Sequence, residues 1–138
     1  MKLTLIILLL VVGCSSAFAQ KLPSHATGVL DSQGRMIYRF VERLPFAYYD
    51  VSTYISKKLK YPDSARKANV QGVVNVGFFI DTKGRIQGVK IKSEERLGYG
   101  LEEEAMRVIQ SLPRWVPGRQ NGRKVNVYYT IPIGFTLE

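Results

Sequence analysis

Apolar and polar residues alternate along residues 71–93, and this stretch organises the rest of the chain. From Val74 to Ile80 an apolar residue recurs at every second position, which places these side chains on one face of a β-strand. Residues 81–84 read Asp-Thr-Lys-Gly, a composition typical of a turn, and the alternation resumes at Val89 and Ile91. A hairpin with one apolar face needs a layer packed on it. The pattern therefore predicts a β-hairpin covered by other elements.

Helical periodicity appears on both sides of this hairpin. Apolar residues recur every three to four positions in residues 51–59, where Asp50 is expected to be the N-cap. The same periodicity in residues 101–112 predicts an amphipathic helix that packs on the hairpin, with Glu103 and Arg107 as an i,i+4 ion pair. Between these helices, residues 62–68 predict a short helix that starts at a proline.

The end of the chain predicts its longest strand. Residues 125–137 are apolar at every odd-numbered position, and Pro132 lacks an amide donor, so this strand is expected at a sheet edge, at least locally around Pro132. Residues 29–41 predict a first strand or a small hairpin. Together the segments predict an α+β fold, a two-layer sandwich. Its antiparallel sheet of three to four strands is covered on one face by two or three helices.

The start of the chain has the composition of an export signal. Lys2 precedes an apolar run over residues 3–12, about half of the ~20 residues that a membrane-spanning helix needs. Ala-Phe-Ala at residues 17–19 matches a signal-peptidase site and predicts a signal peptide over residues 1–19 and a mature chain from Gln20.

A lipoprotein signal is the alternative. Residues 11–14, Val-Val-Gly-Cys, resemble a lipobox, which would give a signal over residues 1–13 and a lipid-anchored Cys14. Both alternatives export the protein. Residues 20–40 are then expected to form a tether with the first strand, and residues 41–138 the folded domain.

Composition narrows the classes of function. Cys14 is the single cysteine, so neither a disulfide framework nor a thiolate metal cluster is predicted. The net charge of +9 indicates acidic partners, which for an exported protein are envelope surfaces or proteins rather than nucleic acid. No spacing of nucleophile, base or metal ligands predicts an enzyme, a cofactor or a metal site.

An ordered set of motifs extends over about residues 41–137. It consists of Tyr61-Pro62, Ala65, Gly72, Val74, Val76, Phe78, Gly84, Val89, Ser93, Leu101, Ala105 and Trp115-Val116-Pro117-Gly118. This ordered set resembles the C-terminal domain of TonB. The chain resembles a short secreted form of that family, since its expected signal is too short for a stable anchor helix and a Pro-rich spacer is essentially absent. Where many bacterial relatives carry a Phe-Pro-Gly-Gly turn, this chain reads Phe46-Ala47-Tyr48-Tyr49-Asp50.

The resemblance implies a periplasmic module that grips TonB-dependent outer-membrane transporters by pairing with their TonB box. It implies energised transport, with inner-membrane motor proteins reached through another component. The alternative is an envelope adaptor that binds peptidoglycan or another periplasmic protein. An exposed strand edge also suits a homodimer, and the edge is open only if the chain's own first strand does not cover it.

Candidate site residues follow from this resemblance and from local composition. Tyr61 and Trp115, large aromatics beside prolines, are expected to close the core rather than to form a recognition groove. Arg119, Arg123 and Lys124 form a basic loop that either holds an acidic partner or is a solvated connector. The candidate edge for β-strand addition consists of Val125, Asn126, Val127, Tyr128, Tyr129 and Thr130.

Overall fold

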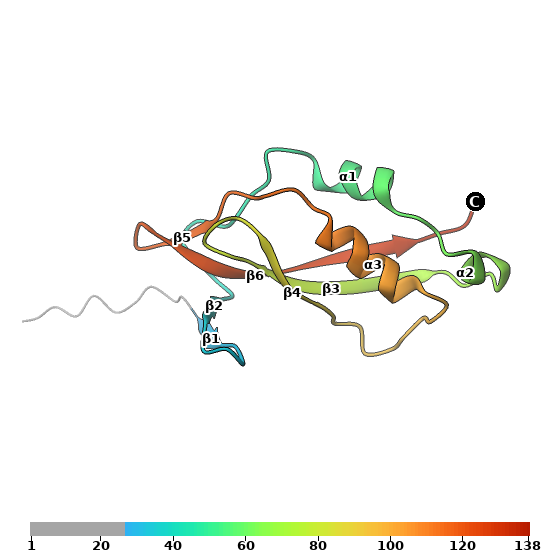
Figure 1. Ribbon diagram of the computed structural model, residues 1–138, viewed down its shortest axis with the longest axis horizontal. Coiled ribbons are helices and arrows are strands. Elements are labelled where there is room, and N and C mark those ends of the chain that lie inside the picture. The colour runs from blue at the N-terminus through green and yellow to red at the C-terminus, as the bar shows by residue number, and fades with distance from the viewer. Residues whose placement is uncertain (1–26) are drawn as a thin grey trace, which may run out of the picture.

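The computed structural model describes residues 27–138, which form three helices and six strands. Figure 1 shows the long central strands with α1 and α3 beside them. The helices are α1 (Val51–Lys58), α2 (Asp63–Lys67) and α3 (Leu101–Gln110). The strands are β1 (Gly28–Leu30), β2 (Met36–Tyr38), β3 (Gly72–Ile80), β4 (Ile86–Ile91), β5 (Gly118–Gln120) and β6 (Arg123–Phe135).

The sheet is built on the antiparallel pair of β3 and β6. The two strands pair from Gly72 opposite Phe135 to Ile80 opposite Val127, and the strand order is β1-β2-β6-β3-β4, with β5 paired to β6. The α+β class is confirmed. The sheet has six strands instead of the expected three to four. It is mixed rather than antiparallel, because β2 runs parallel to β6. Strand β5 was not predicted, because its three residues are too few for a periodic pattern.

The core lies between the sheet and α3. Val74, Val76, Phe78 and Ile80, the alternating residues of β3, are fully buried. They pack against the apolar stripe of α3, so the predicted helix does cover the hairpin. The stripe consists of Leu101, Ala105, Val108 and Ile109.

Asp50 caps α1 as predicted, since its Oδ1 accepts a hydrogen bond of 2.5 Å from the Thr53 amide. Pro62 precedes α2 and has extended backbone, so that helix begins one residue later than expected. The hairpin form of the first segment is the one observed, with β1 antiparallel to β2.

Both alternatives for the export signal, including Gln20 and Cys14, lie outside the described residues. Among the residues that are described, no helix has the length and apolar character needed to cross a membrane.

Candidate functional site

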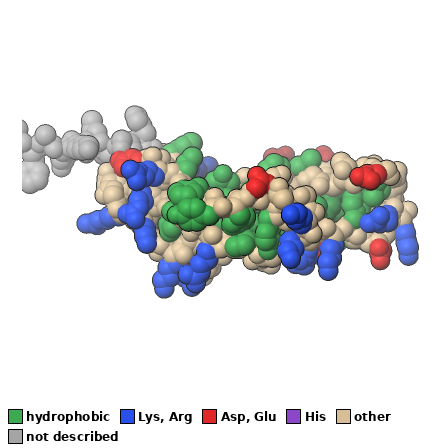
Figure 2. All heavy atoms as spheres, turned by 90° about the horizontal axis from the view of Figure 1, so that it is seen from above, with side chains coloured by type: hydrophobic (Ala, Val, Ile, Leu, Met, Phe, Trp, Pro, Cys, Tyr) green, Lys and Arg blue, Asp and Glu red, His purple; other side chains and the backbone are tan. Residues whose placement is uncertain are grey.

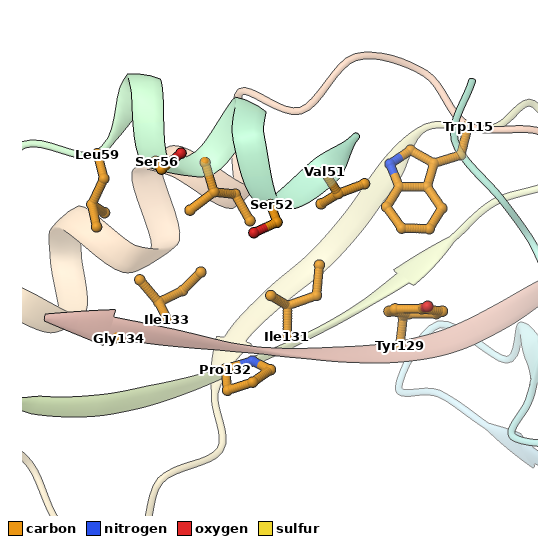
Figure 3. Close-up of a pocket in the computed structure, with 11 residues that line it drawn as sticks. Val51, Ser52, Ser56, Leu59, Trp115, Tyr129, Ile131, Pro132, Ile133 and Gly134 are labelled. Atoms are coloured by element: carbon orange, nitrogen blue, oxygen red, sulfur yellow. The ribbon is translucent and has the colours of Figure 1, made fainter. Parts of the chain in front are cut away.

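A groove of about 450 Å³ runs between α1 and the C-terminal half of β6, residues 129–134. Figure 3 shows Ile131 and Ile133 directed from β6 toward α1, while Pro132 points to the other face of the sheet. Trp115 lies at one end of the groove, with its ring centroid 5.2 Å from that of Tyr129. The wall formed by α1 and the residue after it consists of Val51, Ser52, Ile55, Ser56 and Leu59.

The backbone of β6 faces this groove with unpaired polar groups. Asn75 lies opposite Pro132, and both backbone groups of Asn75 bond on the β4 side, to the Lys92 amide and to Ser93 Oγ. In an antiparallel ladder the residue opposite must then direct its own backbone groups away from β3. Pro132 therefore presents its carbonyl at the outer edge, and Thr130 and Gly134, two residues away on each side, share this orientation.

None of the described strands pairs with that edge beyond Val127. The edge offers the amides of Thr130 and Gly134 and the carbonyls of Thr130, Pro132 and Gly134. Pro132 contributes no donor, which leaves a gap in the middle of the edge. Unpaired edge groups of this kind are what an added β-strand satisfies.

The first part of the candidate edge is covered by the chain's own strands. Val125 pairs with Gly118 of β5. Asn126 and Val127 pair with β2, and Asn126 Nδ2 donates a hydrogen bond of 3.0 Å to the Met36 carbonyl. The open edge therefore lies further toward the C-terminus than the sequence indicated. The local pattern at residues 36–38 indicates a strand, but it does not indicate which other strand that strand pairs with.

The remaining candidate edge residues fall on two faces. Tyr129 lines the groove, whereas Tyr128 lies on the face of the sheet opposite the helices. The Tyr128 hydroxyl is buried without a partner in the described part of the chain, beneath the side chain of Lys92. Thr130 is exposed at the start of the open edge.

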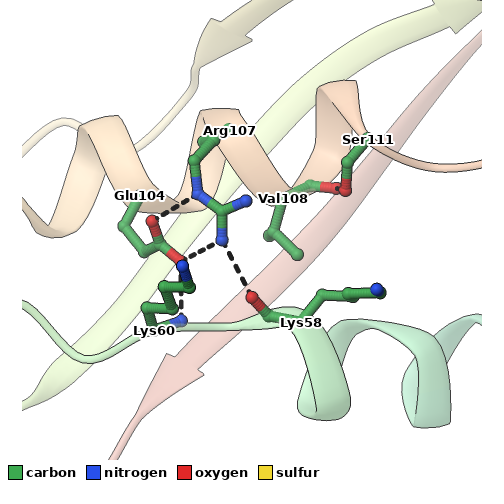
Figure 4. A network of polar contacts seen from close by, with 6 residues as sticks. All are labelled: Lys58, Lys60, Glu104, Arg107, Val108 and Ser111. Atoms are coloured by element: carbon green, nitrogen blue, oxygen red, sulfur yellow. Dashed lines mark hydrogen bonds and ion pairs between the residues drawn. The ribbon is translucent and has the colours of Figure 1, made fainter.

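The groove wall is held in place by an ion pair within α3 that hydrogen-bonds to the backbone at the end of α1 (Figure 4). Arg107 donates to both carboxylate oxygens of Glu104, at 2.7 and 2.6 Å, and to the Lys58 carbonyl at 2.8 Å. Glu104 also accepts from the Lys60 amide at 2.6 Å. The expected pair of Glu103 with Arg107 is replaced by this one, because Glu104 is on the side of α3 that meets α1.

These bonds favour the charged forms of both groups. The hydrogen bonds from Arg107 lower the pKa of the Glu104 carboxyl, and the same contact raises the pKa of Arg107. Two tyrosines add uncharged bonds, from Tyr54 to the Ser111 carbonyl and from Tyr49 to the Pro113 carbonyl. Burial raises the pKa of the Tyr49 hydroxyl, which keeps it a donor.

The two aromatic candidates have different surroundings. Tyr61 packs edge-on to Phe135 and donates to the Val70 carbonyl, so it closes the core as expected. Trp115 is also buried, against Phe78, but it is at the same time a wall of the groove. Its burial in the core is as expected, whereas a part in recognition stays a prediction.

The basic residues lie together at the turn between β5 and β6. Arg123 and Lys124 are exposed, and Arg119 donates to the Gly122 carbonyl at 2.9 Å. Residues 42 and 43 lie beside this turn, because the backbones of Arg43 and Arg119 are paired. The described residues contain no group of three or more His, Cys, Asp or Glu that could hold a metal.

The chain was compared with known proteins. The family model for the Gram-negative bacterial TonB protein C-terminal matches residues 57–137, more than half of the chain. Two NMR solution structures of the Helicobacter pylori TonB C-terminal domain are similar. The shorter is 26% identical and has a TM-score of 0.47, with 62% of this chain and 88% of that chain covered. The longer is 25% identical, with a TM-score of 0.49 and coverages of 64% and 78%. The comparison with curated proteins gave no match. The family match shows that this chain belongs to the Gram-negative bacterial TonB protein C-terminal family.

Proposed function

We propose that this protein is a periplasmic binding module that adds an extended segment of an outer-membrane transporter, its TonB box, to the outer edge of β6. The observation that carries the proposal is the open edge from Thr130 to Gly134 beside an apolar groove. The family match supports a TonB-type partner for this edge.

The geometry defines what the partner segment would contact. Its backbone would form hydrogen bonds with the backbone of Thr130 and Gly134. It would accept no hydrogen bond from Pro132, which has no amide hydrogen. Alternate side chains of the segment would enter the groove, where Ile55 and Ile131 favour apolar groups. The segment could extend along β6 only as far as Val127, because β2 already pairs with β6 from there.

Export by the signal peptide, or anchoring through Cys14, would deliver the domain to the periplasm. Energy would reach it from inner-membrane motor proteins through another component. In this arrangement the role of the domain is to bind the transporter.

The test is a substitution that removes one donor from the outer edge. Thr130→Pro deletes an amide that points away from β3, so the ladder between β3 and β6 stays intact. Thr130→Ala is the matched control, since it keeps the amide. We expect Thr130→Pro to weaken binding of a TonB-box peptide roughly threefold to tenfold relative to Thr130→Ala, the worth of one hydrogen bond.

Backbone NMR of the full chain supplies the second readout. The peptide is expected to shift the amides of residues 128–135 and to leave those of β4 unchanged. Equal affinities of the two variants, or shifts confined to the basic turn, would show that the edge is not the binding site. The latter result would favour the envelope adaptor.

A further inference from the structure

The segment before α1 turns apolar side chains outward, against the usual pattern. Leu44, Phe46 and Tyr48 are 62%, 49% and 84% exposed. The residues between and after them point the other way: Pro45 is buried, and Ala47 and Tyr49 pack on the core. An extended segment normally alternates apolar inward and polar outward. Here both sides are apolar, so folding alone does not explain the outer row formed by Leu44, Phe46 and Tyr48.

The outer row has a defined geometry. The backbone of Phe46 pairs with that of Val116 through bonds of 3.2 and 2.7 Å, so the segment is fixed to the chain that follows α3. The rings of Phe46 and Tyr48 meet edge to face, with centroids 5.2 Å apart. Trp115 is buried, so its neighbour Arg114 is directed outward on the side of the outer row.

The surroundings of the outer row are predominantly positive. Residues 39–48 and 114–124, which lie side by side, contain one carboxylate, Glu42. Glu42 accepts hydrogen bonds from the Asn121 amide and Gln120 Nε2. Figure 2, which looks down on the side that is uppermost in Figure 1, shows hydrophobic side chains gathered on this side, with Lys and Arg and a few Asp or Glu side chains around them. The cations of the two stretches are Arg39, Arg43, Arg114, Arg119, Arg123 and Lys124.

We propose that the outer row and these cations dock the domain on the anionic phospholipid surface of a bilayer. Aromatic rings and a long aliphatic side chain bury well at the boundary between headgroups and acyl chains, and arginines beside them contact lipid phosphates. A second copy of the chain would bring the same positive charge to the interface and be repelled. The outer row lies before residue 57, where the family match begins. It would therefore be a second binding surface, separate from the edge of β6 proposed for the transporter.

A position-specific reporter tests the contact in the full chain. Tyr48→Trp places an indole in the outer row, and Tyr99→Trp places one at an exposed site between β4 and α3 as the matched control. The native Trp115 is buried and gives the same background in both variants. With vesicles of phosphatidylcholine and phosphatidylglycerol that contain brominated lipid, we expect quenching at position 48 and none above background at position 99.

Binding supplies an independent readout. Phe46→Ser combined with Tyr48→Ser is expected to weaken binding to vesicles with phosphatidylglycerol about tenfold or more, because two apolar side chains no longer bury. Tyr99→Ser is expected to bind like the natural chain. Added salt should weaken binding, and vesicles of phosphatidylcholine alone should bind less.

The proposal is wrong if position 48 is quenched no more than position 99, or if the double variant binds as the natural chain does. It is also wrong if the natural chain sediments as a dimer without vesicles and the double variant as a monomer, since the row would then be a self-association surface. Thr130→Pro should leave vesicle binding unchanged, which separates this test from that of the transporter edge.

Discussion

At the scale of single residues, one turn chemistry is used twice. Asp31 and Asp81 each accept from the backbone amides two and four residues later, and each pairs with the arginine four residues later. Gly34 and Gly84 take the left-handed backbone conformation that both turns need. The short sequence Asp-x-x-Gly-Arg therefore closes two hairpins of the sheet, β1–β2 and β3–β4. It was recognisable from sequence because every contact in it is local.

The two glycines differ in their surroundings, which gives a matched pair of substitutions. A Cβ on Gly84 would lie 1.9 Å from the Trp115 carbonyl oxygen, whereas a Cβ on Gly34 would meet nothing within 4 Å. We expect Gly34→Ala to cost about 1 kcal/mol, the strain of a left-handed residue. Gly84→Ala adds a backbone clash and is expected to cost about 3 kcal/mol or more. Chemical unfolding of both variants measures the difference, and equal costs would contradict the clash.

Asp81 should also make stability depend on pH. Burial opposes its charged form, but the hydrogen bonds from the Arg85 and Lys83 amides and from the Arg85 side chain outweigh burial and lower its pKa below the ordinary 3.8. A lowered pKa in the folded state stabilises above pH 3.8, and this stabilisation is lost as the pH falls through the folded value.

The free energy of unfolding of the natural chain should therefore decrease below pH 4. The free energy of unfolding of the Asp81→Asn variant should decrease less over the same pH range. Unfolding in urea between pH 7 and pH 2.5 checks this. Asp31→Asn should flatten the pH dependence in the same way, because the hydrogen bonds from the Arg35 amide and side chain also lower the pKa of Asp31. An unchanged slope in Asp81→Asn would mean that other carboxyls dominate.

At the scale of elements, α1 depends on its neighbours. It has eight residues, none of them fully buried, and isolated helices of that length are unstable in water. Its position comes from bonds at both ends, from Tyr49 and Tyr54 to the end of α3 and from Arg107 to Lys58. Since α1 is a wall of the groove, these bonds also set the width of the groove.

Glu104→Gln is expected to reduce the free energy of unfolding by about 1.5–3 kcal/mol, because hydrogen bonds to a charged group are lost and Arg107 keeps its charge. It should also weaken TonB-box peptide binding as α1 loosens. Glu103→Gln is the control, on the same turn of α3 but exposed. Unfolding curves and peptide titrations measure both effects. If Glu103→Gln is equally destabilised, the helix dipole rather than the ion pair is responsible.

At the scale of the whole molecule, the hairpin of β1 and β2 sets the length of the open edge. It attaches to β6 through two parallel residue pairs and the bond from Asn126 to the Met36 carbonyl. An attachment this small should open more readily than the ladder between β3 and β6.

Asn126→Ala is expected to speed amide hydrogen exchange in residues 28–38 roughly fivefold, the worth of one hydrogen bond of about 1 kcal/mol, without changing exchange in β3. The open edge should then extend toward Asn126, and a TonB-box peptide should shift more amides. Thr130→Ala, on the same face of β6, should leave exchange in the hairpin unchanged. Faster exchange throughout the sheet would instead mean that the hairpin is part of the central fold.

The sequence by itself determined the local elements and the face that each of them buries. The alternation of β3 and β6, the stripe of α3, the cap at Asp50 and the turn at Gly84 are set by neighbours within a few residues, so their patterns could be interpreted directly. The order of matching residues was enough to indicate the family.

Tertiary structure alone decided which part of β6 stays open. Whether an edge is covered depends on β2, almost ninety positions away in the chain, and no periodicity records a pairing between distant segments. The same holds for the choice of Glu104 over Glu103 by Arg107, which required the position of α1. It holds too for the outer row, because the sequence shows apolar residues at 44–48 but not which of them turn outward.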